Sequence, residues 1–185
     1  MIMLKLIDIH KTFNPGTINE KVALNGVDLH LNEGDFVTVI GGNGAGKSTM
    51  LNAVAGAWPV DSGKIIIGGT DVTKLSEYKR AAYLGRVFQD PMTGTAATMG
   101  IEENLALAKR RGKTRLLKPG ITKKEREEYK ELLKVLGLGL EDRLTSKVGL
   151  LSGGQRQALT LLMASIQKPK PLLFDEHTAA LAPHT

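Results

Sequence analysis

The pattern of apolar and polar residues in the first part of the chain is typical of strands. Apolar and polar side chains alternate through residues 27–32, which predicts a strand with one buried face. A turn at Glu33-Gly34 leads into the uninterrupted apolar run Phe36–Ile40, which predicts a strand buried on both faces. A further β-branched run in residues 65–67 ends at Gly68-Gly69, a pair typical of a tight hairpin.

Helical periodicity dominates the later part of the chain. Thr122 and Glu125 have the spacing of a capping box, and Gly137 is a natural end for the helix that follows. A second helix is expected between Ser152, as N-cap, and Pro169. The apolar faces of these helices are Tyr129, Leu132, Leu133 and Leu136 in the first and Leu159, Leu162, Met163 and Ile166 in the second. Strands alternating with helices predict an α/β domain with an added antiparallel portion.

A glycine-rich segment, "GGNGAGKST", joins the predicted strand Phe36–Ile40 to a helix expected after Lys47. It satisfies the pattern G-x-x-x-x-G-K-S, in which glycines let successive backbone N–H groups curl around phosphate oxygens. In this pattern Lys47 can reach the outer phosphates and the Ser48 hydroxyl can ligate Mg²⁺. The alternative is a glycine-rich turn that only caps a helix. The predicted nucleotide contacts are Gly41, Gly42, Asn43, Gly44, Ala45, Gly46, Lys47, Ser48 and Thr49.

Two adjacent carboxylates follow a second apolar run. Leu172–Phe174 suits a buried parallel strand and is followed by Asp175 and Glu176. In ATPases with such a phosphate loop, a carboxylate at the tip of a second strand holds the magnesium ion. Asp175 fits that role, and Glu176 is then placed to orient or deprotonate an attacking water.

Composition and charge narrow the class of protein. The length of 185 residues suits one domain, and the absence of cysteine excludes disulfides. No apolar stretch approaches the ~20 residues that span a membrane, and no signal-peptide layout opens the chain, which predicts a cytoplasmic protein. The net charge of +6 is concentrated in "KRRGKTRLLK", residues 109–118. Because aromatics are few, a solvated basic face is expected there and no nucleic-acid partner.

The segment Leu151–Gln155 reads Leu-Ser-Gly-Gly-Gln, and here the chain resembles the ATP-binding-cassette (ABC) ATPases, whose signature motif this is. The resemblance covers nearly the whole chain in order: the phosphate loop, a glutamine loop at "VFQDP" with Gln89, the signature and the acidic strand. The phrases "FNPGTINEKVAL", "VFQDPMTGTA" and "DEHTAAL" resemble the ATPase subunits of bacterial importers for amino acids or related small solutes.

The resemblance implies a P-loop NTPase fold with a parallel core sheet, an antiparallel β portion and a helical subdomain. Residues 1–90 would form the nucleotide-binding core and β portion, 91–165 the helical and signature portion, and 166–185 the acidic strand returning to the core, in one incomplete ABC domain.

The resemblance also implies cofactors, partners and roles. ATP and Mg²⁺ would bind the phosphate loop, with Gln89 completing the magnesium and water shell. The signature residues would face the γ-phosphate of ATP held by a second copy, in a head-to-tail dimer. The other partner would be an integral-membrane permease, which places the subunit on the inner face of the cell membrane. The implied signature contacts are Ser152, Gly153, Gly154 and Gln155.

The resemblance also implies an aromatic residue that stacks on the adenine base of ATP. Phe13 is the residue expected to stack on adenine, with a place in the core as an equal alternative. Tyr83 and Trp58 are less favoured by position.

The sequence departs from the family pattern near its end. His177 stands where a proline is usual, and Ala182 where an aspartate contacts the opposite subunit. None of the four histidines stands where the family has a further strand ending in a γ-phosphate-contacting histidine, so the chain resembles a truncated cassette.

Three functional hypotheses follow. The first is an ATPase that powers a membrane transporter, and the second is a truncated module that binds MgATP with little or no turnover. The third, a DNA-repair or chromosome ATPase, would need a long coiled coil before the signature, and no sustained heptad pattern occurs there.

Overall fold

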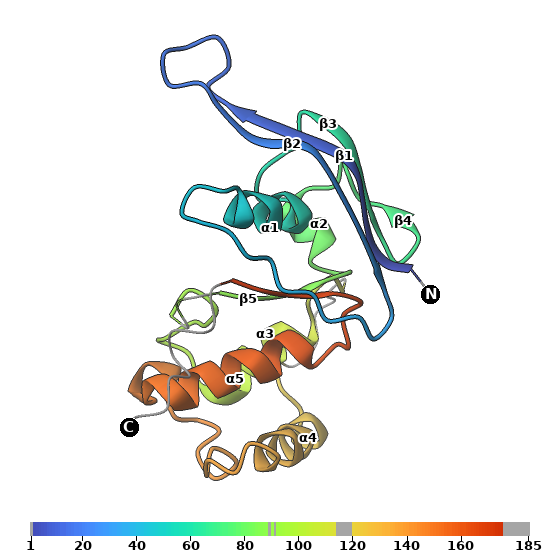
Figure 1. The fold of residues 1–185 in the computed structure, drawn as a ribbon. Helices are drawn as coiled ribbons and strands as arrows, with labels where there is room; N and C mark the ends of the chain where they lie inside the picture. The colour runs from blue at the N-terminus through green and yellow to red at the C-terminus, as the bar shows by residue number, and fades with distance from the viewer. Residues whose placement is uncertain (1, 89, 91, 114–119, 176–185) are drawn as a thin grey trace. The chain divides into compact units, whose positions relative to one another are not determined.

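The chain divides into two compact units, Met1–Gly85 and Arg86–Thr185 (Figure 1). The computed structural model describes residues 2–88, 90, 92–113 and 120–175. Within those ranges, no helix has both the length and the apolar character needed to cross a membrane.

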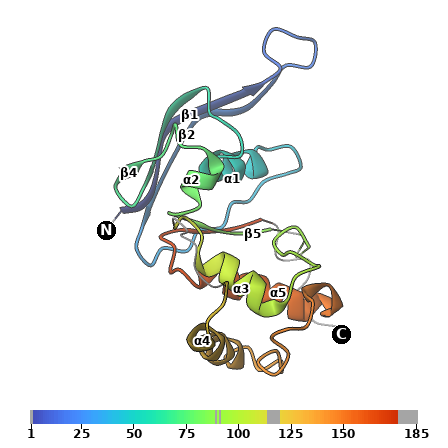
Figure 2. The ribbon, with the colours of Figure 1, turned by 180° about the vertical axis from the view of Figure 1, so that it is seen from behind.

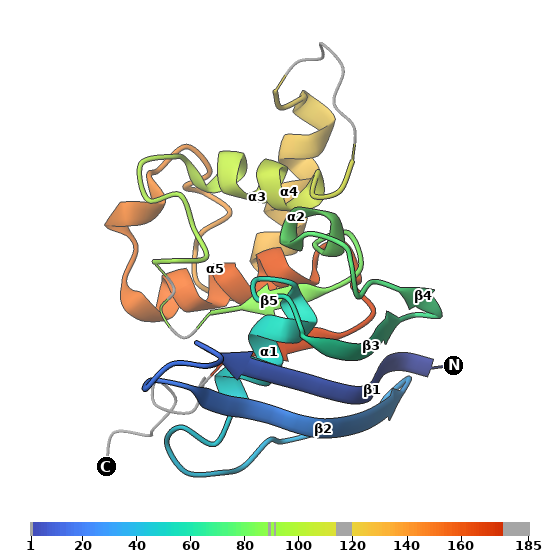
Figure 3. The same cartoon turned by 90° about the horizontal axis from the view of Figure 1, so that it is seen from above.

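The first unit is built on a four-stranded antiparallel sheet in the order β2-β1-β3-β4 (Figure 3). Its strands are β1 (Ile2–Phe13), β2 (Lys21–Asn32), β3 (Ser62–Ile67) and β4 (Thr70–Asp71). Gly68 and Gly69 have φ values of 54° and 81°, so the predicted hairpin is confirmed as a two-residue turn with both φ angles positive. The predicted alternation in residues 27–32 is confirmed too, with the apolar side chains half-buried and the polar ones exposed.

Helix α1 (Lys47–Ala55) packs on one face of this sheet, and the short α2 (Glu77–Arg80) follows β4 (Figures 1 and 3). The helix expected after Lys47 is therefore confirmed. Its last turn is buried, and the sheet contributes Leu4, Leu6, Ile65 and Ile67 to the core of this unit.

The run Phe36–Ile40 corrects the sequence prediction. It is not a strand, and Phe36 and Ile40 have exposed fractions of 88% and 90%. An apolar run becomes a buried strand only when neighbouring strands satisfy its N–H and C=O groups. Among the described residues, no strand pairs with this run, so its backbone stays irregular and its side chains stay in solvent.

The second unit joins a small sheet to a cluster of helices. Strand β5 (Gly85–Val87) pairs with β6 (Leu172–Phe174). The strand predicted at Leu172–Phe174 forms, but only Leu173 is buried, so the expectation of full burial is wrong. In this two-stranded sheet, side chains that alternate between its faces leave Leu172 and Phe174 exposed.

Three helices form the core of the second unit: α3 (Ile101–Lys109), α4 (Lys123–Lys134) and α5 (Gly153–Ser165), with a 3-10 turn at Val148–Leu150. Figure 2 shows α3 beside both α4 and α5. The predicted capping box forms at Thr122, and Ser152 is the N-cap of α5 as predicted, where Gln155 completes a second capping box. The predicted apolar faces pack into one cluster, in which Tyr129, Leu133 and Leu159 are fully buried.

Candidate nucleotide-binding site

The phosphate loop, residues 41–46, lies curled against β2. Gly44 and Gly46 adopt φ values of 81° and 88°, which favour glycine. A methyl group added at Gly46 would stand 2.5 Å from the carbonyl oxygen of Ala23, so only glycine lets the loop approach the strand this closely. At Gly46, therefore, the geometry requires the glycine that the motif predicts.

The N-terminus of α1 follows this loop and has no side-chain cap. Gly46 is the N-cap, and the first helical hydrogen bond runs from Met50 N to Gly46 O, 2.8 Å long. The N–H groups of the first helical turn, which begins at Lys47, consequently lack helical acceptors. With the positive end of the helix dipole, they form a site suited to an anion.

Lys47 lies across the loop that precedes it. Its Nζ donates to the carbonyl oxygens of Gly41, at 2.6 Å, and Gly42, at 2.9 Å. An ammonium group has three donors, so a phosphate oxygen can take up the third or replace these carbonyls. The loop, Lys47 and the helix start thus meet at one place in the first unit, as the motif predicts.

Phe13 lies at the end of β1 and is half-buried. Its ring packs edge-on against Trp58, with ring centroids 5.1 Å apart and an interplanar angle of 84°. Lys11 Nζ stands 5.5 Å from the Phe13 centroid and forms a 3.0 Å ion pair with Asp61. The backbone N–H of Thr12 donates to the other oxygen of Asp61, at 2.5 Å. These contacts set the position of the Phe13 ring.

Asp175 directly follows β6 in the second unit. Its backbone N–H donates to Val87 O at 3.2 Å, and its carboxylate lies 3.5 Å from the Arg86 guanidinium. The side chain is partly exposed, so an oxygen ligand for a cation is available at the strand tip. The other predicted residues of this region, Gln89, Glu176, His177 and Ala182, lie outside the described residues.

The signature residues begin α5. Ser152 Oγ accepts from Gln155 N at 3.3 Å, and Gln155 Oε1 accepts from Ser152 N at 3.1 Å. Gly153 and Gly154 are exposed, and no described atom would lie within 4 Å of a methyl group added at either. A bulky anion can therefore approach the N–H groups at this helix start closely.

Comparison with known proteins places these features in a family. Residues 24–179 match the family described as ABC transporter. The tyrosine transport ATP-binding protein of Clostridioides difficile is 44% identical over 99% of this chain and 72% of its own length. The methionine import ATP-binding protein MetN of Rhizobium etli is 37% identical over 99% of this chain and 47% of its own length.

The chain belongs to the ABC transporter family. It is an ATP-binding subunit, the ATPase component that powers membrane transport. Its fold agrees with the dimeric post-hydrolysis structure of the ATP-binding cassette MJ0796 bound to ADP and Pi, with a TM-score of 0.79 and 29% identity over 98% of this chain and 77% of that one. The predicted fold class is therefore confirmed.

In this ABC cassette the structure reveals a buried arginine, Arg80, that the sequence analysis did not predict. Arg80 in α2 is 1% exposed and donates to four carbonyl oxygens. Two belong to the last turn of α1, Ala53 at 2.6 Å and Val54 at 3.1 Å. The others are Thr73 at 2.7 Å and Leu75 at 2.9 Å. A lone arginine in a polar segment gives no signal of burial, so only the structure reveals that it anchors the helix of the phosphate loop.

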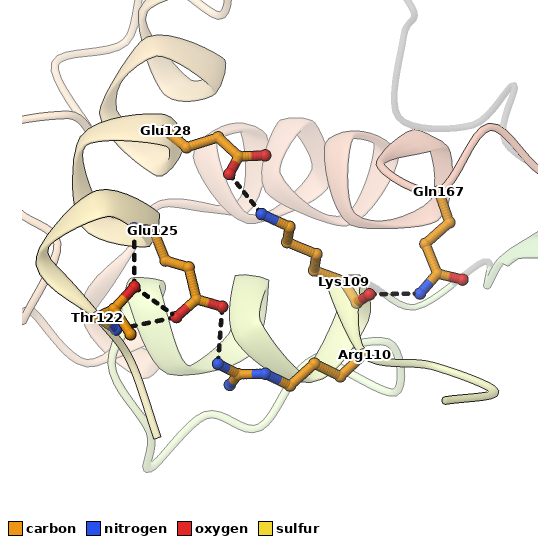
Figure 4. Close-up of polar contacts among 6 residues, drawn as sticks. All are labelled: Lys109, Arg110, Thr122, Glu125, Glu128 and Gln167. Atoms are coloured by element: carbon orange, nitrogen blue, oxygen red, sulfur yellow. Dashed lines mark hydrogen bonds and ion pairs between the residues drawn. The ribbon is translucent and has the colours of Figure 1, made fainter. Parts of the chain in front are cut away.

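In the basic segment, residues 109–118, the first two charges are neutralised by ion pairs within the second unit (Figure 4). Lys109 forms an ion pair with Glu128, and Arg110 pairs with Glu125 at 2.8 Å, both across to α4. Gln167 Nε2 donates to the carbonyl oxygens of Lys109, at 2.5 Å, and Arg111, at 3.0 Å. Residues 114–119 lie outside the described part of the chain. The first two basic residues therefore act in helix packing.

Proposed function

We propose that this cassette binds MgATP at its phosphate loop and hydrolyses it to drive a transporter for an amino acid or a similar small solute. The observation that carries the proposal is the curled phosphate loop. The uncapped N-terminus of α1 follows it directly, and the ammonium group of Lys47 lies across it. Amide donors, a helix dipole and a lysine at one place suit a polyphosphate.

The residues divide the work by chemical type. The N–H groups of residues 41–49 and Lys47 would hold the outer phosphates, and Phe13 would stack on adenine. Ser48, Gln89 and Asp175 would supply the oxygen ligands that Mg²⁺ prefers. When bound, the ion neutralises charge on the phosphates. Glu176 would orient the attacking water and accept its proton.

A second copy would complete the site. Ser152, Gly153, Gly154 and Gln155 form a second anion-binding helix start, which suits the γ-phosphate of ATP held by the other copy. The dimeric state of the MJ0796 cassette supports this arrangement. The permease partner, and a place on the inner face of the membrane, are supported by the transport proteins among the relatives.

The solute class rests on the relatives alone. The names of the relatives above refer to tyrosine transport and methionine import, and the first is 44% identical to this chain. An ATP-binding subunit does not contact the solute, so the permease would provide the selectivity.

The test compares three proteins by calorimetric titration with MgATP and by phosphate release. The natural chain should bind saturably and hydrolyse. Lys47→Ala should lose binding by about tenfold or more, because a charge-assisted contact to phosphate is lost. Glu176→Gln should bind normally and release no phosphate. Unchanged affinity in Lys47→Ala would remove the phosphate loop as the binding site.

A second candidate function is binding of MgATP with little turnover. The exposed run Phe36–Ile40 favours it, because this run leads directly into the phosphate loop and leaves the loop without a strand behind it. Single-turnover phosphate release at saturating protein separates the two. Release no faster than in Glu176→Gln supports the binding module, and release that Glu176→Gln abolishes supports the ATPase.

A further inference from the structure

Lys21, the first residue of β2, lies against the phosphate loop. A methyl group added at Gly44 would stand 3.3 Å from Lys21 Nζ. The ammonium is therefore in contact with the loop at a residue whose φ of 81° belongs to the curled conformation.

The sheet register explains how Lys21 reaches this place. It is the partner, in the β1–β2 ladder, of Phe13, the residue proposed to stack on adenine. Ala23, two residues further along β2, contacts the loop at Gly46 through its carbonyl oxygen. The start of β2 thus runs from the strand partner of Phe13 to the loop, and the Lys21 ammonium lies against the loop at Gly44.

The charge of Lys21 is not neutralised where it lies. The side chain is exposed, and within the described ranges no carboxylate is in ion-pair contact with it. Lys11, also in this unit, pairs with Asp61. Two ammonium groups, those of Lys21 and Lys47, then contact one short loop and repel each other until an anion binds.

We propose that Lys21 is a second ammonium contact to the bound nucleotide, on the part of the phosphate chain nearest the base. This rests on the proposed function of the loop. Lys47 lies across Gly41 and Gly42 and would contact the outer phosphates, whereas Lys21 contacts the loop at Gly44 and is the strand partner of Phe13. The contact recognises phosphate charge, so nucleotides use it and adenosine does not.

The experiment measures the affinities of MgATP, ADP and adenosine for four proteins: the natural chain, Lys21→Met, Lys21→Arg and Lys74→Met. Lys74→Met is the matched control, because it removes the same charge from an exposed site between β4 and α2. Lys21→Met should weaken both nucleotides by about 5- to 30-fold, the range for one partly solvated charged contact. Lys21→Arg should restore most of that loss, and adenosine binding should not change.

The salt dependence of the affinity for ATP is a second test of the Lys21 contact. The affinity of Lys21→Met for ATP should fall less steeply with added salt than that of the natural chain, since one screened charge pair is gone. Nucleotide affinities of Lys21→Met equal to those of Lys74→Met would overturn the proposal. So would an equal loss for adenosine, which would place Lys21 at the base. Failure of the proposed function is a different result: the natural chain would not bind MgATP, or Lys47→Ala would bind it normally.

Discussion

At the scale of single residues, Asp61 helps to position Phe13, the residue proposed to stack on adenine and called the platform below. Its carboxylate holds the backbone of Thr12 and the side chain of Lys11, the two residues before Phe13. The hydrogen bond from Thr12 N, and then the one from Lys11, lower the pKa of Asp61 below its usual 3.8. A lowered pKa means that these contacts persist at neutral pH and are lost only as the pH falls through the folded-state value.

Asp61→Asn should therefore weaken ATP binding by roughly two- to fivefold, because the ion pair with Lys11 is lost while one amide oxygen still accepts a bond. Inorganic tripolyphosphate, which has no base, should bind as before. Asp71→Asn is the control: hydrogen bonds from Thr73 lower the pKa of this carboxyl too, but it lies in the β3–β4 hairpin. An equal loss for tripolyphosphate and ATP would show that Asp61 supports the loop and not the platform.

At the scale of elements, local sequence chemistry predicts helix starts well and long-range pairing poorly. The capping box at Thr122 and the N-cap at Ser152 need only residues a few positions apart, and both form as predicted. The run Phe36–Ile40 has the composition of a buried strand, but burial depends on strands elsewhere in the chain. Arg80 is the converse case, a charged residue that is buried because α1 and the segment between β4 and α2 supply four carbonyl oxygens.

Two glycines, Gly56 and Gly69, can be used to test whether Arg80 anchors α1. Gly56 ends α1 at φ 85°, and a methyl group there would stand 2.9 Å from Arg80 Cδ and Nε. Gly69 has a similar φ, 81°, with no described atom within 4 Å of such a methyl group. Both alanine variants incur the left-handed backbone cost of about 1–2 kcal/mol.

Only Gly56→Ala must also displace a buried guanidinium, so its melting temperature should fall at least twice as far as that of Gly69→Ala. In an Arg80→Met background the extra loss should disappear, because the obstacle is gone. Equal losses for the two glycine variants in the natural chain would show that Arg80 moves aside freely and does not anchor α1.

At the scale of the whole molecule, the ordered motifs predict the family, but the sequence does not reveal which charges the fold brings together. The phosphate loop, the signature and the acidic strand each carry their own chemistry, so their order along the chain is informative without a structure. Lys21 carries no motif, and its place against Gly44 follows from the β1–β2 register together with the curled loop. Such pairings depend on backbone geometry, which residue patterns alone do not determine.

In the proposed head-to-tail dimer, the start of α5 in one copy contacts the γ-phosphate of ATP held by the other copy. Ser152→Arg places a long side chain at the start of α5, where the γ-phosphate from a second copy would bind, and it also removes the cap bond to Gln155. Thr122→Arg is its matched control, since it removes the equivalent cap bond to Glu125 at the start of α4. Each variant should lose about 1 kcal/mol of helix stability.

Only Ser152→Arg should abolish ATP-dependent dimers, measured by sedimentation velocity in a Glu176→Gln background that keeps ATP intact. Binding of ATP to the monomer should be unchanged in both variants, because the phosphate loop is untouched. If Ser152→Arg still forms dimers with ATP as Thr122→Arg does, the signature helix does not contact the second nucleotide. Loss of dimers in both variants would mean that the helical unit must be stably folded for association, whichever cap is removed.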